Sequence, residues 1–264
     1  MRLISYRGIV DVMDLRNLLL PGGIGLSRIK VYEQAGPDGV IGGGAHFHSV
    51  SAESYYVISG HGKLELLSYQ GFEVLDLEPN KLIYFQPGVI HRVCNPNKNL
   101  VILSIMQNGG VAERTDLFLT FPMEIISDAR AYQRAMHSRD MNEAIARRDL
   151  SITGYRILRD AMENEPARGR ELLEQLYRRA QELMKAKFSG LEWFINNCVV
   201  PEAKAGYDAI EFLRDGNTAY LERAVWDQAK PETLEEFDGI TGRIMPYIRT
   251  DSASPNREEK RASD

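Results

Sequence analysis

The chain has 264 residues, of which 44% are hydrophobic and 26% are charged, which is typical of a folded protein with one large or two small domains. Its formal net charge of −5 argues against a nucleic-acid-binding protein, which normally carries a basic face. Two distant cysteines, Cys94 and Cys198, predict no disulfide framework and fit a reducing compartment. The chain shows neither a signal-peptide pattern nor an apolar stretch of ~20 residues, so we expect a cytoplasmic protein that crosses no membrane.

The first part of the chain predicts strands. Residues 1–24 mix short apolar runs and would supply a strand and a short helix. The alternating segment 25–34 reads as a strand with Arg28, Lys30 and Tyr32 on one face. These three side chains are candidate substrate-binding residues that would pair with a carboxylate or phosphate at a barrel mouth. The alternative is that they lie on the solvent face.

Residues 44–62 and 85–95 contain a cluster of candidate metal ligands. His46 and His48 are two residues apart, so both imidazoles project from one face of a strand. Glu53 opens the next predicted strand, and an adjacent antiparallel pairing would let it face both histidines. His91 begins another strand after a turn. Three imidazoles and one carboxylate suit a divalent iron, manganese, nickel, zinc or cobalt ion.

Further short strands follow this cluster. Residues 63–69 and 72–78 flank Gln70-Gly71 as a hairpin, and strands are also expected at 82–85 and across 99–107. About eight short strands without helical periodicity predict a small antiparallel barrel or jelly roll over residues 1–122. Alternation around a ligating His91 places Val93 inside the barrel and Arg92 outside it.

The two ligand-bearing stretches resemble the two motifs of the cupin superfamily. The first motif is matched by the HxH pattern at 46–48, a four-residue spacer, Glu53 and Gly60. The second is matched by Gly88, His91 and Asn95, with Asn80 in place of its first glycine. The resemblance covers about residues 25–110. It implies a cupin jelly roll that binds one divalent metal ion through His46, His48, Glu53 and His91.

The character of the sequence changes to helical at about residue 123. Residues 166–188 carry an apolar stripe opposite charged residues, with Pro166 at the first turn. Further helices are expected at 141–149, 152–163, 191–199, 202–214, 217–229 and from Pro231. We therefore predict a β + α protein with a cupin barrel at 1–122, an α-helical region at 123–249 and a disordered polar tail at 250–264. The helical region would cap the barrel, mediate dimerisation or form its own bundle.

The predicted site suits several functions. Four ligands leave two positions open on an octahedral ion, where the metal would activate dioxygen or act as a Lewis acid. The favoured function is an iron(II)-dependent dioxygenase for a small polar or anionic substrate. A metal-dependent isomerase, lyase or decarboxylase and a non-catalytic metal- or ligand-binding sensor are the alternatives.

Tyr55 is the candidate catalytic residue beside the ligands. It shares the strand face of Glu53, so its phenol would face the barrel interior and donate to a substrate. The competing interpretation is a core aromatic whose hydroxyl meets a nearby acceptor. His61 lies in a glycine-flanked turn and is expected to be exposed, and His137 receives no role. We expect a small-molecule substrate, a homodimer, and neither nucleic-acid nor membrane partners.

Overall fold

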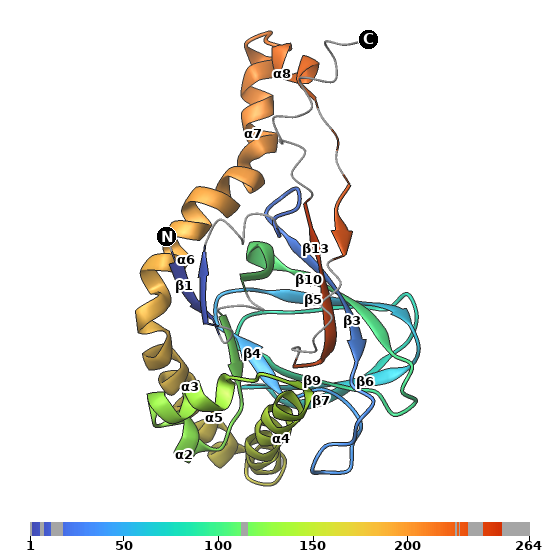
Figure 1. Cartoon of the computed structure of the whole chain (residues 1–264), viewed down its shortest axis with the longest axis vertical. Coiled ribbons are helices and arrows are strands. Elements are labelled where there is room, and N and C mark those ends of the chain that lie inside the picture. Colours follow the sequence, from blue (N-terminus) through green and yellow to red (C-terminus); the bar gives the residue numbers. More distant parts are fainter. Residues whose placement is uncertain are drawn as a thin grey trace.

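Two antiparallel β-sheets face one another, and helices cover the outer surface of one of them (Figure 1). The computed structural model describes residues 2–5, 8–11, 18–111, 116–224, 226, 228–231 and 240–249. A cupin-like β-sandwich followed by a helical region is therefore confirmed. No helix among the described residues is long and apolar enough to cross a membrane.

The strand order of both sheets mixes distant parts of the chain. The six-stranded sheet runs in the order β12 (Lys230–Pro231), β13 (Gly242–Ile248), β3 (Gly25–Val31), β10 (Val101–Met106), β5 (Glu53–Ser59) and β8 (Leu82–Phe85). The five-stranded sheet runs in the order β11 (Leu117–Leu119), β4 (His46–His48), β9 (Ile90–Cys94), β6 (Gly62–Ser68) and β7 (Gly71–Leu77). A separate hairpin joins β1 (Arg2–Ser5) to β2 (Gly8–Asp11).

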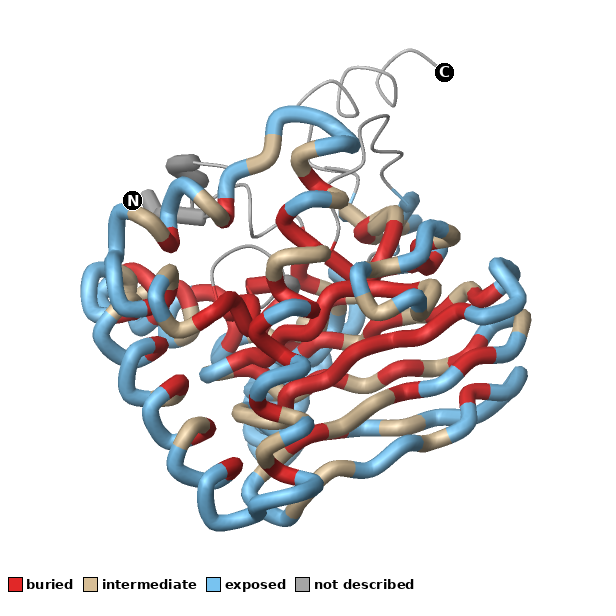
Figure 2. Tube along the Cα trace, turned by 90° about the horizontal axis from the view of Figure 1, so that it is seen from below, coloured by how far each residue is buried: buried red, intermediate tan, exposed pale blue. Residues whose placement is uncertain are grey.

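The space between the sheets is filled by side chains that alternate along each strand. On β5, Tyr55 and Val57 are buried whereas Ser54 and Tyr56 are only partly so, as expected for a strand with one core face. The interior cluster consists of Ile29, Val31, Tyr55, Val57, Leu64, Leu77, Phe85, Val93, Leu100 and Ile102. Figure 2 shows this concentration of buried residues in the strands.

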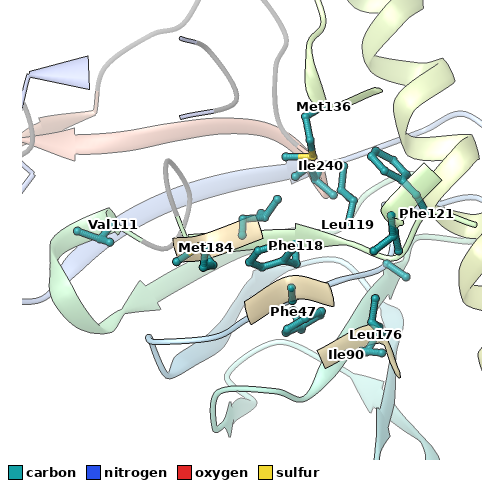
Figure 3. Close-up of a cluster of buried hydrophobic side chains, with 14 of the residues drawn as sticks. Phe47, Ile90, Val111, Phe118, Leu119, Phe121, Met136, Leu176, Met184 and Ile240 are labelled. Atoms are coloured by element: carbon teal, nitrogen blue, oxygen red, sulfur yellow. The ribbon is translucent and has the colours of Figure 1, made fainter. Parts of the chain in front are cut away.

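The helical region packs on the outer face of the five-stranded sheet. Its longest helices are α4 (Met141–Asn164) and α5 (Pro166–Met184). On β4, Phe47 points away from the two histidines and contacts Phe118 and Tyr177, with ring centroids 5.5 and 5.4 Å apart. Leu176 and Met184 of α5 belong to the same buried cluster (Figure 3). This packing assigns the helices a role as a cover on the barrel.

The remaining helical elements lie before and after this pair. They are η1 (Gln107–Gly110), α2 (Met123–Ile126), α3 (Ala129–Met136), η3 (Lys185–Lys187), α6 (Phe188–Phe194), the π-helical turn η4 (Ile195–Val199), α7 (Val200–Arg214) and α8 (Ala219–Glu222). The helices expected at 141–149 and 152–163 form one continuous helix, α4, in which the Oγ of Ser151 donates a hydrogen bond to Arg148 O. The helix expected at 217–229 is shortened to α8.

Strand β13 is the main departure from the expected organisation. It lies in the region expected to be helical up to residue 249, but it pairs with β3 in the six-stranded sheet, between β3 and the short edge strand β12. The helical assignment is therefore wrong for residues 242–248, while the division into two domains stays a prediction. The capping box expected after Pro231 and the tail at 250–264 lie outside the described residues.

The turns explain how the chain departs from the cupin motif without losing its geometry. Asn80, which stands where the motif has glycine, has φ of 71°, a left-handed conformation that asparagine tolerates better than most residues. Asn95 is buried and ties two segments together: its Nδ2 donates to Tyr32 O at 3.1 Å and its Oδ1 accepts from Leu100 N at 3.1 Å. Asn80 and Asn95 therefore have structural roles.

Candidate metal centre

The four predicted ligands come from both sheets and meet in the barrel interior. His46 on β4 lies directly opposite His91 on β9, and His48 faces the same side of β4 two residues later. Glu53 is the first residue of β5, in the opposite sheet. The expectation that Glu53 sits on a strand paired with β4 is therefore wrong: it faces the histidines across the interior.

The ligand atoms form a tight group. Four donor atoms, one from each residue, lie within 4.8 Å of one another. His91 Nε2 lies 3.0 Å from His46 Nε2 and 3.2 Å from Glu53 Oε2, and His48 Nε2 lies 3.3 Å from the same oxygen. All four side chains are at most 4% exposed, so bulk water does not separate them.

Hydrogen bonds to the far side of the rings orient the imidazoles. The Nδ1 atom of His46 lies 3.2 Å from Gly44 O, and that of His91 lies 3.0 Å from Val89 O. Since a carbonyl oxygen can only accept, each Nδ1 carries the proton and each Nε2 presents a lone pair to the centre. Two lone pairs facing each other at 3.0 Å repel unless a cation lies between them. The donor set and its orientation therefore fit a bound metal ion.

The electrostatics of the group favour the protonation states that a metal requires. Burial, together with the neighbouring His91 and His48, holds the pKa of His46 well below its usual value, so its imidazole is neutral at pH 7. Burial alone would raise the pKa of Glu53, but its close contacts with the imidazoles of His48 and His91 outweigh burial and hold that pKa well below its usual value. A neutral imidazole at His46 and an ionised carboxylate at Glu53 are the forms that bind metal.

A small cavity adjoins the ligands. Its volume is about 20 Å³, room for a water-sized group. Besides the ligands His46, His48 and Glu53, the cavity is lined by Ile29, Tyr55, Leu117, Ile240, Thr241 and Ile244. Apart from the ligands, the residues with polar side chains among its described lining are Tyr55 and Thr241.

The other predicted site residues divide into two groups. Tyr55 is 1% exposed and faces the interior as expected, with its ring 5.9 Å from that of His91. Arg28 and Lys30 lie on the exposed face of β3, whereas their neighbour Ile29 lines the cavity. Tyr32 is buried beyond the end of β3, under the guanidinium of Arg148 at 4.9 Å. Arg28, Lys30 and Tyr32 therefore do not line the cavity.

Two positioning residues were missed by the sequence analysis. Ser104 Oγ donates to Glu53 Oε1 at 2.7 Å, which leaves Oε2 directed at the histidines. Asp116 is fully buried and accepts hydrogen bonds from the backbone of Ser49, Val50 and Ser51, the segment that joins His48 to Glu53. Ser104 could have been identified in the sequence as a polar residue in an apolar strand, whereas no sequence pattern indicated a role for Asp116.

Two buried arginines hold the loop that leads into His46. Arg92 points out of the barrel as expected, but it is fully buried and pairs with Asp38 at 2.6 Å while donating to Gly43 O at 3.1 Å. Arg148 on α4 donates to Gln34 O at 2.8 Å and to Ala35 O at 2.9 Å. The outward direction of Arg92 agrees with the expectation from alternation, and its burial was not predicted because it depends on the loop and helix that cover this face.

Comparison with known proteins finds a family match over the segment that contains this site. Residues 34–106, which include all four ligands, match the family model of the cupin domain. No curated protein matches the chain.

Similar solved structures are local matches. They include a mutant of Bacillus subtilis oxalate decarboxylase (24% identity over 33% of this chain and 24% of that chain, TM-score 0.29). A Klebsiella pneumoniae protein with a double-stranded β-helix domain shows 16% identity over 38% and 77% of the two chains, with a TM-score of 0.27. A putative sugar phosphate isomerase from Acidithiobacillus ferrooxidans shows 28% identity over 24% and 38%, with a TM-score of 0.21.

The chain thus spans about a quarter of the length of the decarboxylase that it matches. Such partial similarity carries no information about activity. The family match and the four converging side chains agree on the same segment, and the chain therefore contains a cupin domain with a complete three-histidine, one-glutamate metal-binding group, followed by a helical region.

Proposed function

We propose that the cupin domain is a mononuclear metal-dependent dioxygenase, with iron(II) as the favoured ion. The observation that carries the proposal is the buried group of three imidazoles and one carboxylate beside a water-sized, mostly aliphatic cavity. Such a donor set leaves coordination positions open, as in the histidine–carboxylate sites of non-haem iron oxygenases. A small apolar gas such as dioxygen suits an aliphatic cavity of this size.

The residues around the ligands orient them and keep bulk water away from them. Gly44 O and Val89 O fix two imidazoles, and Ser104 fixes Glu53, so the ligands need little rearrangement to bind. A metal held there would supply redox or Lewis-acid chemistry at its open positions. Tyr55 and Thr241 line the cavity, and their hydroxyls would anchor a polar atom of the substrate or move a proton to it.

The lining and the volume of the cavity limit which substrates could bind there. The expected polar or anionic substrate finds no cationic side chain among the described lining residues other than the ligand histidines. We therefore propose a small substrate with one or two polar groups and an apolar remainder. Since about 20 Å³ is too small for most organic molecules, its entry requires movement of the wall formed by Ile240, Thr241 and Ile244.

The test is oxygen consumption by the iron-loaded protein with a panel of diols, thiols and catechols. We expect uptake that is lost in His91→Ala and kept in the matched control His61→Ala, because His61 is exposed and lies outside the ligand group. Turnover that persists without oxygen would replace this proposal with an isomerase, lyase or decarboxylase. Metal binding with ligand-dependent association but no turnover would replace it with a sensor.

A further inference from the structure

A second cavity lies outside the barrel, where the end of α3 meets the first turns of α4. Its volume is about 390 Å³, within the range of small-molecule pockets. One wall is formed by Glu143, Ala146, Arg147 and Leu150, which share a face of α4 by their spacing. It shares no lining residue with the cavity at the metal centre.

Positive groups dominate the lining of this cleft. The guanidinium groups of Arg134, Arg139 and Arg147 line it, against the single carboxylate of Glu143, and His137 completes the polar part of the lining. Arg147 is only 3% exposed, and its Nη1 donates to Met136 O at 2.9 Å, which fixes the guanidinium between the two helices. A buried, positioned guanidinium beside exposed ones is an arrangement that recognises oxyanions.

The one carboxylate in the lining, that of Glu143, is already paired with an arginine. Arg139 Nε donates to Glu143 Oε1 at 2.9 Å, and this pairing lowers the pKa of Glu143 to about 2. Glu143 therefore partly neutralises Arg139 and leaves Arg134 and Arg147 as the main positive groups. Asp140 lies close by but caps the start of α4 by accepting from Glu143 N at 2.9 Å.

We propose that this cleft binds a small organic anion that carries a carboxylate or phosphate group. The guanidinium groups of Arg134 and Arg147 would hold the oxyanion, since their planar forks match both head groups. Ala135, Ala146 and Leu150 would contact its carbon skeleton. The proposal is independent of the reaction at the metal centre.

The test is calorimetric titration of the full chain with inorganic phosphate and with citrate. The probe that binds more tightly identifies the head group. Arg134→Gln should weaken binding of that probe about tenfold, the loss of one charge-assisted hydrogen-bonding group. Glu143→Gln should tighten it, because Arg139 is then released towards the anion. The control Arg130→Gln, an exposed arginine of α3 outside the lining, should bind as the unaltered protein does.

Several outcomes would overturn the proposal. Absence of saturable binding of both probes would do so, as would equal weakening by Arg130→Gln and Arg134→Gln, which would indicate general surface charge. The metal-free variant His91→Ala separates this site from the metal centre: binding must survive there. Anion binding lost in His91→Ala but kept in Arg134→Gln would place the anion at the metal instead.

Discussion

Asp116 should be the residue outside the ligand set on which the metal centre depends most. Its carboxylate accepts from Ser49 N at 2.9 Å, Ser49 Oγ at 2.6 Å, Val50 N at 2.9 Å and Ser51 N at 2.9 Å. Asp116→Ala leaves three backbone N–H groups without their acceptor, at about 1 kcal/mol each. We therefore expect the free energy of unfolding to fall by about 3 kcal/mol.

The same change should weaken metal binding, because the segment from Ser49 to Ala52 sets the distance between His48 and Glu53. Loss of a residue that orients ligands typically lowers metal affinity about 10- to 100-fold. Urea denaturation of the metal-free protein measures the stability, and competition with a chelator measures the affinity.

Asp128→Ala is the matched control for this prediction. Asp128 caps α3 by accepting from Arg130 N at 2.8 Å, so its loss should cost about 1 kcal/mol and leave metal affinity unchanged. A loss below about 1 kcal/mol in Asp116→Ala, with unaltered metal affinity, would refute the reasoning.

Three further predictions concern the ligands and the helical cover. Ser104→Ala removes the hydrogen bond to Glu53 and should lower metal affinity about tenfold, as measured by competition with a chelator. An unchanged affinity would contradict the positioning role of Ser104. Gly154→Ala would place a Cβ 2.2 Å from Thr120 O and should lower the free energy of unfolding by about 1–3 kcal/mol in urea; a stabilised variant would be inconsistent with this contact. Because folding lowers the pKa of His46, its imidazole binds a proton at a higher pH in the unfolded chain than in the folded chain. Stability of the metal-free protein should therefore fall as pH drops below about 6.5, with a further loss from Glu53 below about 4.5, and a stability that rises on acidification would contradict these shifts.

The His46–His48 pair could be predicted from local geometry, whereas the resemblance to the cupin motifs supplied the complete ligand set. Alternation along a strand determines that His46 and His48 share a face, and the same rule places Tyr55 beside Glu53. Alternation does not specify which sheet a strand joins, so Glu53 was assigned to the wrong partner. On β3 the rule separated Arg28 and Lys30 from Ile29 correctly, but it failed for Tyr32, which is buried beyond the end of the strand, and it did not tell which face lines the cavity.

The parts that failed depend on contacts between distant segments. β13 pairs with β3 across more than half of the chain, and its Pro246 is unfavourable for a strand except at an edge or a bulge. The burial of the outward-pointing Arg92 was not predicted, because no local sequence pattern indicates that α4 and the preceding loop cover it. The helical region covers part of the outer face of the five-stranded sheet, so outward residues such as Phe47, Leu67 and Ile90 are buried as well.

The measurement that tests the account most directly is elemental analysis of the purified native protein beside His48→Ala and His91→Ala. We expect about one divalent ion per chain in the native protein, with iron favoured, and its loss in both variants while circular dichroism shows the folded barrel. Zinc, nickel or manganese would keep the centre and redirect the function towards Lewis-acid chemistry. A native protein without metal, or folded variants that retain it in full, would contradict the assignment of these histidines as ligands.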